Sequence, residues 1–386
     1  MAERPTLLCV ANFASNTGYA WDFIEGLYAK VGDELASRGV RTLVSYPKMR
    51  GFPRPLEGSN ASPVELDFGV SSLPQLRATL RFIRANNVRT IYMTDRDACS
   101  PAYPLFRSAG VRHIVMHDHT SGERSEPHGA RRIAKWMYTR IPGVAADDII
   151  CVSDYVARRQ VAVGRVPPRR VKRVWNGIPV SAPSGDTGEL RDIAGASTDQ
   201  PLVVCCCRAD EVKGVKHLLR AFDIACRALE QKGVRPALIY IGDGPQRGEL
   251  ETIRSSLASR DSITFTGYRQ NATALLGEAD ICVVPSIWQD ALPLGVLEPM
   301  ASGKPVIGTS VGGIPEMIDD GVTGMIVPPG DAAALAAALV RLLQDPELCR
   351  AFGAAGRKRV AQHFTPEEQI RTLTAIVGRG FGERSS

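Results

Sequence analysis

Short apolar runs alternate with amphipathic segments along the first half of the chain. The run TLLCVANF (6–13) is typical of a buried strand, and the segment 21–39 has the apolar spacing of a helix that ends at Gly39. The same alternation predicts further strands at 40–47, 88–95, 111–118 and 148–154, and helices near 73–86 and 101–109. Strands that alternate with helices indicate βαβ units and a parallel sheet covered on both faces.

The alternation restarts after a stretch rich in Pro, Ser, Gly and Asp. That stretch, 181–200, is the predicted linker. Beyond it the pattern predicts strands at 201–209, 236–244, 262–268, 279–286, 304–310 and 324–330, with helices at 215–231, 246–258, 271–278 and from about 292. The fold class predicted is α/β, with two doubly wound, Rossmann-like domains at 1–180 and 201–365.

The last segment, 366–386, forms a separate element in this prediction. Thr365 precedes it as a helix cap, and Pro366, Glu367 and Glu368 suit a first turn with an acidic N-terminus. We expect this helix to pack on one of the domains, with the N-terminal one as a candidate. Ligands of open α/β sheets bind beyond the carboxyl ends of the strands, so a cleft between the domains could hold one substrate on each half.

The composition argues against a disordered or a fibrous protein. Apolar residues make up 44% and charged residues 23% of the 386 residues, as in ordinary globular chains. The nine cysteines have no CxxC spacing, so reduced thiols without a structural metal are expected. The N-terminus does not resemble a signal peptide, and no stretch approaches the roughly 18 apolar residues of a membrane span, so a cytoplasmic location is expected.

Positive charge is concentrated in the first half. The chain carries a net charge of +6, and residues 101–175 alone contain 14 Lys or Arg against 6 Asp or Glu. This window suits phosphate-bearing ligands, acidic glycans or an anionic lipid surface, or it is a solvated basic face; no motif for nucleic acid is present. The segment RRIAKWMYTR (131–140) either lies on an anionic membrane, at the inner face, or packs in its domain with solvated arginines.

Two carboxylates frame an apolar run near residue 290. Asp290 lies just before a predicted helix that starts near Pro293, and Glu298 lies one to two turns inside it. Pro293 would set the first turn of that helix, and the backbone N–H groups around it, from Leu292 to Leu294 and Gly295, would form an anion site. The alternatives are that Asp290 caps the helix and that Glu298 is a buried partner of a nearby cation or backbone group.

Cations and glycines follow neighbouring predicted strands. Arg208 and Lys213 lie in the loop after strand 201–207, where they could neutralise a diphosphate. A turn at Gly242 and Gly244 would let a ligand approach the backbone closely, and Gly267 and Tyr268 in FTGY could read a base edge. Solvent exposure is the alternative for each cation taken alone.

Taken in order, these motifs resemble the nucleotide-sugar half of the family 4 retaining glycosyltransferases. The motifs are R-x4-KG from Arg208, IGDGP (241–245), FTGY, PS-x3-D-x7-E ending at Glu298, and GKPVIGT (303–309). The resemblance covers about 170 residues closely and extends loosely into the first half through NTGYA, VMHDH, CVSDYV and VWNGI. It implies the GT-B fold.

The resemblance also implies roles for individual residues. Glu298 would bind the ribose hydroxyls and Asp290 the donor sugar, while Arg208 and Lys213 would bind the diphosphate. His117 would contact the donor sugar from the other domain. Gly18 would approach the donor phosphate or the acceptor.

The sequence departs from the family pattern at several of these positions. Asp290 replaces the usual Glu, and Asp-Ala-Leu-Pro (290–293) replaces Glu-Gly-Phe-Gly. Pro299 follows Glu298 where Ala is usual, and SNTGYA replaces the common double-glycine loop. These departures concern sugar selectivity and the acceptor side.

The function expected is transfer of a sugar from a nucleoside diphosphate sugar to an acceptor hydroxyl, with retention of configuration and without a metal or other cofactor. The acceptor would be a glycan, a lipid-linked saccharide or a small molecule. A nucleotide-sugar epimerase of the same fold and a non-catalytic nucleotide or glycan binder are the alternatives, and turnover without an acceptor would identify the epimerase.

Overall fold

The computed structural model describes residues 4–180 and 188–382, which form two compact units. The N-terminal unit joins the residues up to Thr120, the segment Arg124–Trp175 and the C-terminal segment from Glu367. The C-terminal unit joins Ser121–Glu123 and Asn176–Pro366. Residues 181–187 of the predicted linker and 383–386 of the predicted C-terminal segment lie outside the described residues.

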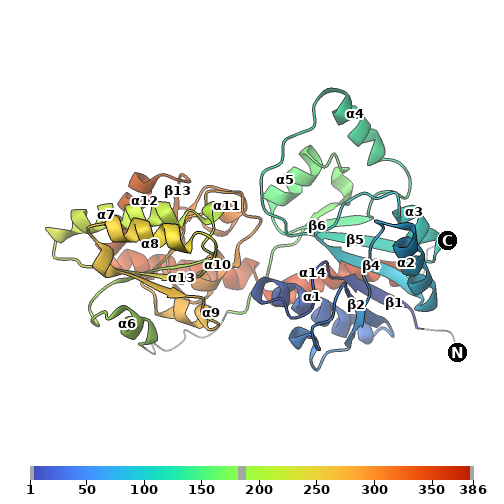
Figure 1. The fold of residues 1–386 in the computed structure, drawn as a ribbon, viewed down its shortest axis with the longest axis horizontal. Coiled ribbons are helices and arrows are strands. Elements are labelled where there is room, and N and C mark those ends of the chain that lie inside the picture. The colour runs from blue at the N-terminus through green and yellow to red at the C-terminus, as the bar shows by residue number, and fades with distance from the viewer. Residues whose placement is uncertain (1–3, 181–187, 383–386) are drawn as a thin grey trace. The chain divides into compact units, whose positions relative to one another are not determined.

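The N-terminal unit is built on a parallel sheet whose seven described strands run in the order β3-β2-β1-β4-β5-β6-β7 (Figure 1). Neighbouring strands are paired in parallel throughout. The strands are β1 (Thr6–Val10), β2 (Arg41–Tyr46), β3 (Ala61–Glu65), β4 (Val88–Thr94), β5 (His113–Asp118), β6 (Asp148–Cys151) and β7 (Val171–Arg173). The central strands are almost wholly buried, as expected of a sheet covered on both faces.

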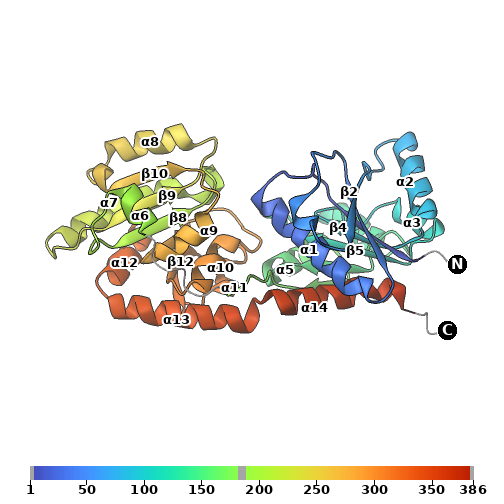
Figure 2. The same ribbon diagram turned by 90° about the horizontal axis from the view of Figure 1, so that it is seen from below.

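Helices from both ends of the chain belong to this unit. They are α1 (Tyr19–Ala36), α2 (Leu73–Ala85), α3 (Tyr103–Ser108), α4 (Gly129–Tyr138), α5 (Asp154–Ala162) and α14 (Pro366–Val377). Figure 2 shows α14 running along the N-terminal unit. Its residues Ile370, Leu373 and Val377 belong to the same buried cluster as Leu7 of β1 and Tyr28 of α1. The last helix of the chain therefore completes the first core.

The C-terminal unit repeats the architecture with the strand order β10-β9-β8-β11-β12-β13, again parallel. Its strands are β8 (Leu202–Cys206), β9 (Ala237–Ile241), β10 (Ile263–Gly267), β11 (Ile281–Val284), β12 (Val306–Thr309) and β13 (Gly324–Val327). Its helices are α6 (Glu189–Ala194), α7 (Val215–Glu230), α8 (Arg247–Ser256), α9 (Ala272–Leu275), α10 (Leu294–Ala301), α11 (Ile314–Met317), α12 (Ala332–Leu343) and α13 (Pro346–His363). The predicted fold class, two doubly wound parallel α/β units, is confirmed.

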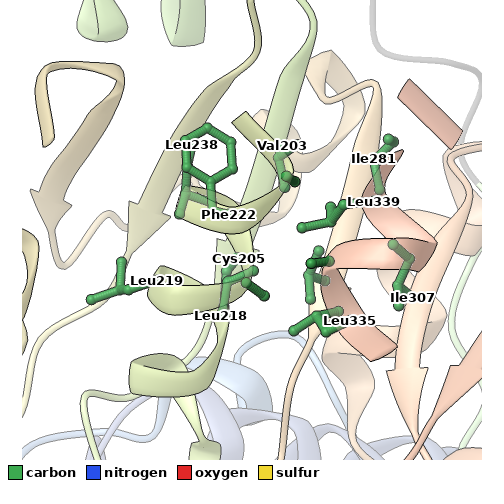
Figure 3. Packing of buried hydrophobic residues seen from close by; sticks show 14 of the residues in the cluster. Val203, Cys205, Leu218, Leu219, Phe222, Leu238, Ile281, Ile307, Leu335 and Leu339 are labelled. Carbon is green, nitrogen blue, oxygen red and sulfur yellow. The ribbon is translucent and has the colours of Figure 1, made fainter. Parts of the chain in front are cut away.

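Helices α7 and α12 lie side by side on one face of the second sheet and supply its core. Figure 3 shows Phe222 of α7 and Leu339 of α12 in one cluster with Val203 of β8, and none of these three side chains has exposed surface. Removing the Phe222 ring would cost about 3–5 kcal/mol of unfolding free energy, because the packed neighbours could only partly fill the cavity. This core holds the ends of β8 and β11 in fixed positions.

Several local features differ from the sequence prediction. Residues 188–200 of the predicted linker contain α6, because Leu190 is buried and its N–H donates to the Glu278 carboxylate, 2.9 Å away. The pattern did not predict β3 or α5. All nine cysteines are free, as expected.

Candidate functional site

The C-terminal sheet reverses its winding direction between β8 and β11, which are neighbours. Strands β9 and β10 lie on one side of this pair, and β12 and β13 lie on the other. Ligands of doubly wound sheets bind beyond the carboxyl ends of the strands at such a point of reversal. The loops that leave β8 and β11 carry Arg208, Lys213, Asp290 and helix α10, so this edge is the candidate site.

Lys213 and Asp290 form an ion pair across this point of reversal. Lys213 Nζ lies 2.7 Å from Asp290 Oδ1, although the two residues are 77 positions apart. Lys213 ends a short 3-10 turn (Glu211–Lys213) that Asp210 caps through its side chain. The Lys213 side chain is 26% exposed and that of Asp290 only 7%. Asp290 therefore needs this cation, because a nearly buried carboxylate without donors would be costly.

Gly214 allows the two loops to come this close. Its φ is +67°, and a Cβ there would lie 2.1 Å from the carbonyl oxygen of Pro285, the residue that follows the end of β11. Next to it, the N–H of Ile287 donates to the carbonyl of Val212 at 2.9 Å. A glycine is required at 214 both for the left-handed backbone and for the contact.

The second oxygen of Asp290 also has a donor. Ser286 Oγ donates to Asp290 Oδ2 at 2.7 Å, and the N–H of Gly313 donates to the main-chain carbonyl of Asp290 at 2.9 Å. Pro293 is the N-cap residue of α10, and no side chain caps that helix. The sequence allowed Asp290 to be the cap of this helix, and the structure shows that it is not. Its carboxylate binds Lys213 and Ser286 instead.

Glu298 lies in the second turn of α10 and is half-buried. Thr273 Oγ1 lies 3.3 Å from Glu298 Oε1, within hydrogen-bond distance. Burial raises the pKa of Glu298 to about 7. At neutral pH both the charged and the neutral form of this carboxyl are therefore populated. A ligand that donates hydrogen bonds to it would favour the charged form.

The start of α10 presents main-chain donors at the same edge. Val296 N–H donates to the carbonyl of Pro293, whereas the N–H groups of Leu294 and Gly295 find no acceptor among the described residues. Leu292 is buried before the helix begins. Helix α10 starts one residue after Pro293 rather than at it. Free N–H groups at the positive end of a helix suit an anion.

Arg208 takes a different position from Lys213. It lies two residues beyond β8, and its side chain is 68% exposed. Within the described part of the chain, its guanidinium forms a long ion pair of 3.8 Å with Asp210. The structure places Arg208 at the predicted edge but outside the contact between Lys213 and Asp290.

The predicted glycines lie at the carboxyl ends of β9 and β10. Gly242 follows β9 with a φ of +156°, and a Cβ there would lie 1.9 Å from the Cys207 carbonyl oxygen, so no other residue fits. Its N–H donates to the carbonyl of Gly267 at 3.0 Å. Gly244 continues the same turn, and Tyr268, after Gly267, is 70% exposed. These residues extend the candidate site from β8 towards β10.

His117 lies in the N-terminal unit, one residue before the end of β5, and is fully buried. Its Nδ1 is 2.7 Å from the Tyr92 hydroxyl, and its ring packs 4.0 Å from the ring of His119. Burial, together with the charge of His119, holds the pKa of His117 well below its usual value, so the imidazole is neutral. In the described residues its buried Nε2 has no hydrogen-bond partner.

Gly18 is the N-cap residue of α1, in the loop after β1 of the same unit. Its φ is +122°, with open space where a Cβ would lie. Asn16, two residues earlier, donates through Nδ2 to the carbonyls of Arg50 and Phe52 at 2.8 and 3.0 Å. The loop that replaces the double-glycine form is therefore tied to the loop after β2.

The sequence did not reveal the interactions that hold Asp118, the last residue of the strand that carries His117. Asp118 is buried and accepts from Arg159 at 3.1 Å and from Gln160 Nε2 at 2.6 Å. Burial alone would raise the pKa of Asp118, but the Arg159 guanidinium and the hydrogen bonds lower it overall. Because Arg159 is 41 residues away, no local pattern could reveal this pair.

Two other contributions were also missed. Ser286 appeared in the quoted motif without a role. The short segment 121–123 groups with the C-terminal unit, where Gly122 N–H donates to the Gln289 carbonyl at 2.7 Å and Ser121 Oγ accepts from Ala291 N–H at 3.3 Å. These bonds hold the backbone on both sides of Asp290.

Residues 4–180 and 188–382 contain no group of three or more His, Cys, Asp or Glu side chains arranged to hold a metal ion. Among the helices in these ranges, none combines the length and the apolar character needed to cross a membrane.

Sequence comparison identifies relatives for both units. Residues 28–182 match the family model described as Glycosyltransferase Family 4, and residues 200–345 match the model described as Glycosyl transferases group 1. The chain is 29% identical over 309 residues to the alpha-D-kanosaminyltransferase of Streptomyces kanamyceticus, which covers 75% of each chain. It is also 29% identical over 338 residues to a GDP-mannose-dependent alpha-(1-6)-phosphatidylinositol monomannoside mannosyltransferase of Mycolicibacterium smegmatis, covering 84% of this chain and 81% of the relative.

Structural comparison gives the same fold. The Anabaena protein Alr3699/HepE, solved in complex with UDP, superposes with a TM-score of 0.74 at 19% sequence identity. The superposition covers 97% of this chain and 99% of that protein. The predicted fold class, GT-B with two Rossmann-like domains, is thereby confirmed.

Proposed function

The chain belongs to the family 4 glycosyltransferases, and we propose that it moves a hexosyl or related group from a nucleoside diphosphate sugar to an acceptor hydroxyl. Its activity as a glycosyltransferase in bacterial-type glycan or glycolipid synthesis follows from the matched families and relatives. The proposal adds the nucleotide-sugar donor, retention of the anomeric configuration, and catalysis without a metal or other cofactor.

One observation carries the proposal: the pair of Lys213 and Asp290 lies at the point of reversal of the C-terminal sheet, beside the start of α10. A cation, a carboxylate and free main-chain N–H groups are thereby assembled where doubly wound sheets bind ligands. A nucleoside diphosphate sugar has the matching groups, since its diphosphate is anionic and its sugar offers hydroxyls. The mannosyltransferase relative is described as GDP-mannose-dependent, and the structural neighbour Alr3699/HepE was solved in complex with UDP. Both support this class of donor.

The residues of the C-terminal unit divide the donor among them in this proposal. Glu298 accepts hydrogen bonds from the ribose hydroxyls, and the backbone around Gly242, Gly244, Gly267 and Tyr268 borders the base and the phosphates. The free N–H groups of Leu294 and Gly295 hold the distal phosphate. Asp290 binds hydroxyls of the transferred sugar with the lone pairs that Lys213 and Ser286 leave free.

Stabilisation of the departing diphosphate is the main catalytic effect proposed. Lys213 and Arg208 provide cations, and the start of α10 adds a positive dipole, so negative charge that grows on the leaving oxygen meets three positive groups. Asp290 holds Lys213 in place before the donor arrives, and no rearrangement of the cation is needed during the reaction. Arg208, being exposed, would move onto the diphosphate when the donor binds. These groups do the work that a divalent metal does in other sugar transferases.

In the N-terminal unit, His117 is proposed to contact the transferred sugar through Nε2. Because burial keeps the imidazole neutral, it can accept or donate one hydrogen bond without adding charge. Gly18, in the loop held by Asn16, would let the donor phosphate or the acceptor approach the backbone.

Retention is proposed to occur by departure and attack on the same face of the sugar. A covalent route would need a free nucleophile, but each carboxylate oxygen of Asp290 already accepts a short hydrogen bond. Mass spectrometry of the protein mixed with a slow donor tests this step. A glycosyl adduct on any side chain would refute the same-face route, and determination of the product anomer would test retention itself.

The acceptor proposed is a hydroxyl of a glycan, a lipid-linked saccharide or a small molecule, bound by the N-terminal unit. The location proposed is the cytoplasm, at the inner surface of a membrane. The basic window 101–175 supports a partner that carries negative charge.

Thermal unfolding with a panel of nucleoside diphosphates and their sugars, without added metal, tests the donor assignment. A ligand at a hundred times its dissociation constant should add about 2.7 kcal/mol to the unfolding free energy. Glu298→Ala should abolish the selective shift, whereas the matched control Glu347→Gln, on the exposed surface of α13, should retain it. Absence of any shift with folded protein would contradict the donor half of the proposal.

Turnover assays separate the proposed transferase from the alternatives. A transferase releases the nucleoside diphosphate much faster when an acceptor is present. An epimerase would convert the donor without any acceptor, and a binder would show the thermal shift but no turnover across a wide set of acceptors.

A further inference from the structure

Helix α4 has an unusual environment for a helix of a folded domain. Within the described chain, every other helix of ten or more residues buries at least one side chain, but α4 buries none. Figure 1 shows α4 projecting from the rest of the N-terminal unit. One of the two alternatives from the sequence was that this helix packs into its domain. The structure excludes that alternative, because α4 buries no side chain.

The exposed side chains of α4 include four large apolar ones. Ile133, Trp136, Met137 and Ile141 are 61%, 45%, 54% and 47% exposed. Their spacing of three, one and four residues places them along one stripe of the helix and its C-terminal extension. Large apolar side chains gathered on one exposed face usually mark an interaction site.

Positive charge surrounds this stripe without any negative charge in the same segment. Between residues 127 and 146 the chain contains Arg131, Arg132, Lys135 and Arg140, and neither Asp nor Glu. All four cations are exposed. Arg140 lies over the Trp136 ring, with its guanidinium carbon 4.2 Å from the ring centre.

The C-terminal end of α4 is fixed to the domain although its apolar stripe is not covered. Thr139 is buried, and its Oγ1 lies 2.9 Å from the Arg165 carbonyl oxygen. Arg140 Nη1 donates to the Trp136 carbonyl at 2.9 Å and approaches the Arg165 carbonyl at 3.3 Å. The stripe is therefore presented by an anchored helix.

Helix α2 provides an internal comparison. It also carries exposed cations, Arg77, Arg81 and Arg84, and no acid, but it buries Thr79 and Ile83 against its own unit. Of these two helices, only α4 combines unpaired positive charge with an exposed apolar stripe. That combination, rather than charge alone, distinguishes a helix that lies in a lipid interface.

We propose that α4 docks the N-terminal unit on an anionic lipid surface. The apolar stripe enters the boundary between headgroups and acyl chains, and Arg131, Arg132 and Lys135 contact the anionic headgroups. This deepens the location proposed above, and its test does not depend on glycosyl transfer. A lipid surface accounts for the charge and the apolar stripe together. A stable protein interface, by contrast, uses about 20–30 residues a side, far more than this stripe offers.

Flotation of the full chain with vesicles tests the proposal. Phosphatidylcholine vesicles with and without phosphatidylglycerol are compared at low and high salt. We expect binding that requires the anionic lipid and weakens with salt, because screening shortens the reach of exposed charges. The emission of Trp136 should shift to the blue on binding, and Trp136→Phe should remove that shift.

Matched variants assign the binding to α4. Arg131→Glu with Lys135→Glu should lower the vesicle partition coefficient at least 10-fold, since each cation near an anionic surface contributes roughly fivefold. Ile133→Ser with Trp136→Ser should also lower it at least 10-fold. The controls are Arg77→Glu with Arg81→Glu, and Leu73→Ser, which change equally exposed residues of α2 and should leave binding within about twofold of the unchanged protein.

Three results would overturn the proposal. They are failure of the folded wild-type chain to float with anionic vesicles at low salt, an equal loss of binding in the α2 variants, and a concentration-dependent dimer that Trp136→Ser abolishes while no vesicle binding occurs. The last result would make the stripe a contact between copies of the chain. Because the nucleotide-dependent thermal shift is measured without lipid, it would identify failure of the donor assignment separately.

Discussion

Lys213 Nζ lies 2.7 Å from Asp290 Oδ1, and this contact joins the loop after β8 to the loop after β11. The nearby pair of Lys216 and Glu211 is equally short at 2.8 Å, but the Glu211 side chain is 63% exposed. The two pairs share a loop and differ in burial, which makes the second a control for the first.

Lys213→Met should lower kcat/KM by about 10²–10³, the loss seen when one group that stabilises a leaving oxyanion is removed. It should also lower the unfolding free energy by about 1–3 kcal/mol, because Asp290 keeps only Ser286 as a side-chain donor. Kinetics and denaturant unfolding measure the two effects. Lys213→Met with Asp290→Asn should recover much of the stability and none of the activity.

Lys216→Met is the control for that prediction and should change stability by less than about 1 kcal/mol, as for exposed ion pairs. Equal losses of activity in the Lys216 and Lys213 variants would mean that the contact with Asp290 has no special role.

Gly214→Ala should destabilise the protein and reduce donor binding, because the new Cβ would lie 2.1 Å from the Pro285 carbonyl oxygen and the backbone has a φ of +67°. The cost should exceed about 1 kcal/mol, the usual penalty of a left-handed alanine. Gly248→Ala is a matched control in α8, where a Cβ meets nothing within 4 Å. This control should stabilise the chain by about 0.5–1 kcal/mol, since alanine has a higher helix propensity than glycine. Thermal unfolding of both variants decides whether the approach of the two loops is as tight as described.

Glu298 predicts a specific pH dependence of stability. Burial raises its pKa from an ordinary 4.5 to about 7, so between these pH values the folded protein holds a proton that the unfolded chain has lost. The unfolding free energy contributed by this group therefore falls as pH rises from about 4.5 to 7 and is constant above that range. Glu298→Gln should be more stable than the unchanged protein above pH 7, by at most about 3 kcal/mol, and similar to it below pH 5. Denaturant unfolding across this range provides the measurement.

The same group should control donor affinity in the opposite direction. If Glu298 accepts hydrogen bonds from ribose, affinity for a nucleoside diphosphate sugar should rise as pH increases through 7, because only the charged carboxylate accepts from both hydroxyls. A nucleotide sugar is chosen because its diphosphate diester does not titrate in this range. A pH-independent affinity in calorimetry would separate Glu298 from the ribose.

The low pKa of His117 predicts that this residue does not titrate in the neutral pH range. Burial and His119 keep its pKa well below the usual value, so the dependence of kcat/KM on pH should show no histidine ionisation near 6.5 from this residue. His117→Ala should lower kcat/KM about 10-fold, the value of one hydrogen bond to the sugar. Tyr92→Phe, which removes the partner of Nδ1 and leaves Nε2 in place, should lower it less. A larger effect of Tyr92→Phe than of His117→Ala would contradict a direct contact by His117.

The predicted site follows from local patterns to an unequal degree. Gly242, Gly267 and the start of α10 could be placed from sequence, because apolar runs mark strands and turn residues mark where they end. The partners of Asp290 could not. Lys213 and Ser286 are neighbours of Asp290 only because the sheet order sets β8 beside β11, and that order depends on how the strands cross over.

The environment of His117 shows the same division. The sequence placed this residue at a strand end, but its neutrality depends on burial by β4 and on the ring of His119, and the strand end depends on Arg159, 41 residues from Asp118. The exposure of α4 was likewise undecided from its sequence, since an amphipathic helix fits a core and a lipid surface equally well. The structure distinguishes the two, because Thr139 is buried against its unit while Trp136 stays 45% exposed.

The sequence by itself determined the α/β class, the two doubly wound halves and the edge of the sheet at which the candidate site lies, because these depend on periodicity and on turn residues that act over a few positions. The tertiary structure decided which charges pair, which carboxyl keeps a proton near neutral pH and which helix remains uncovered. Those properties depend on distance and burial between segments far apart in the chain, and no local pattern encodes them.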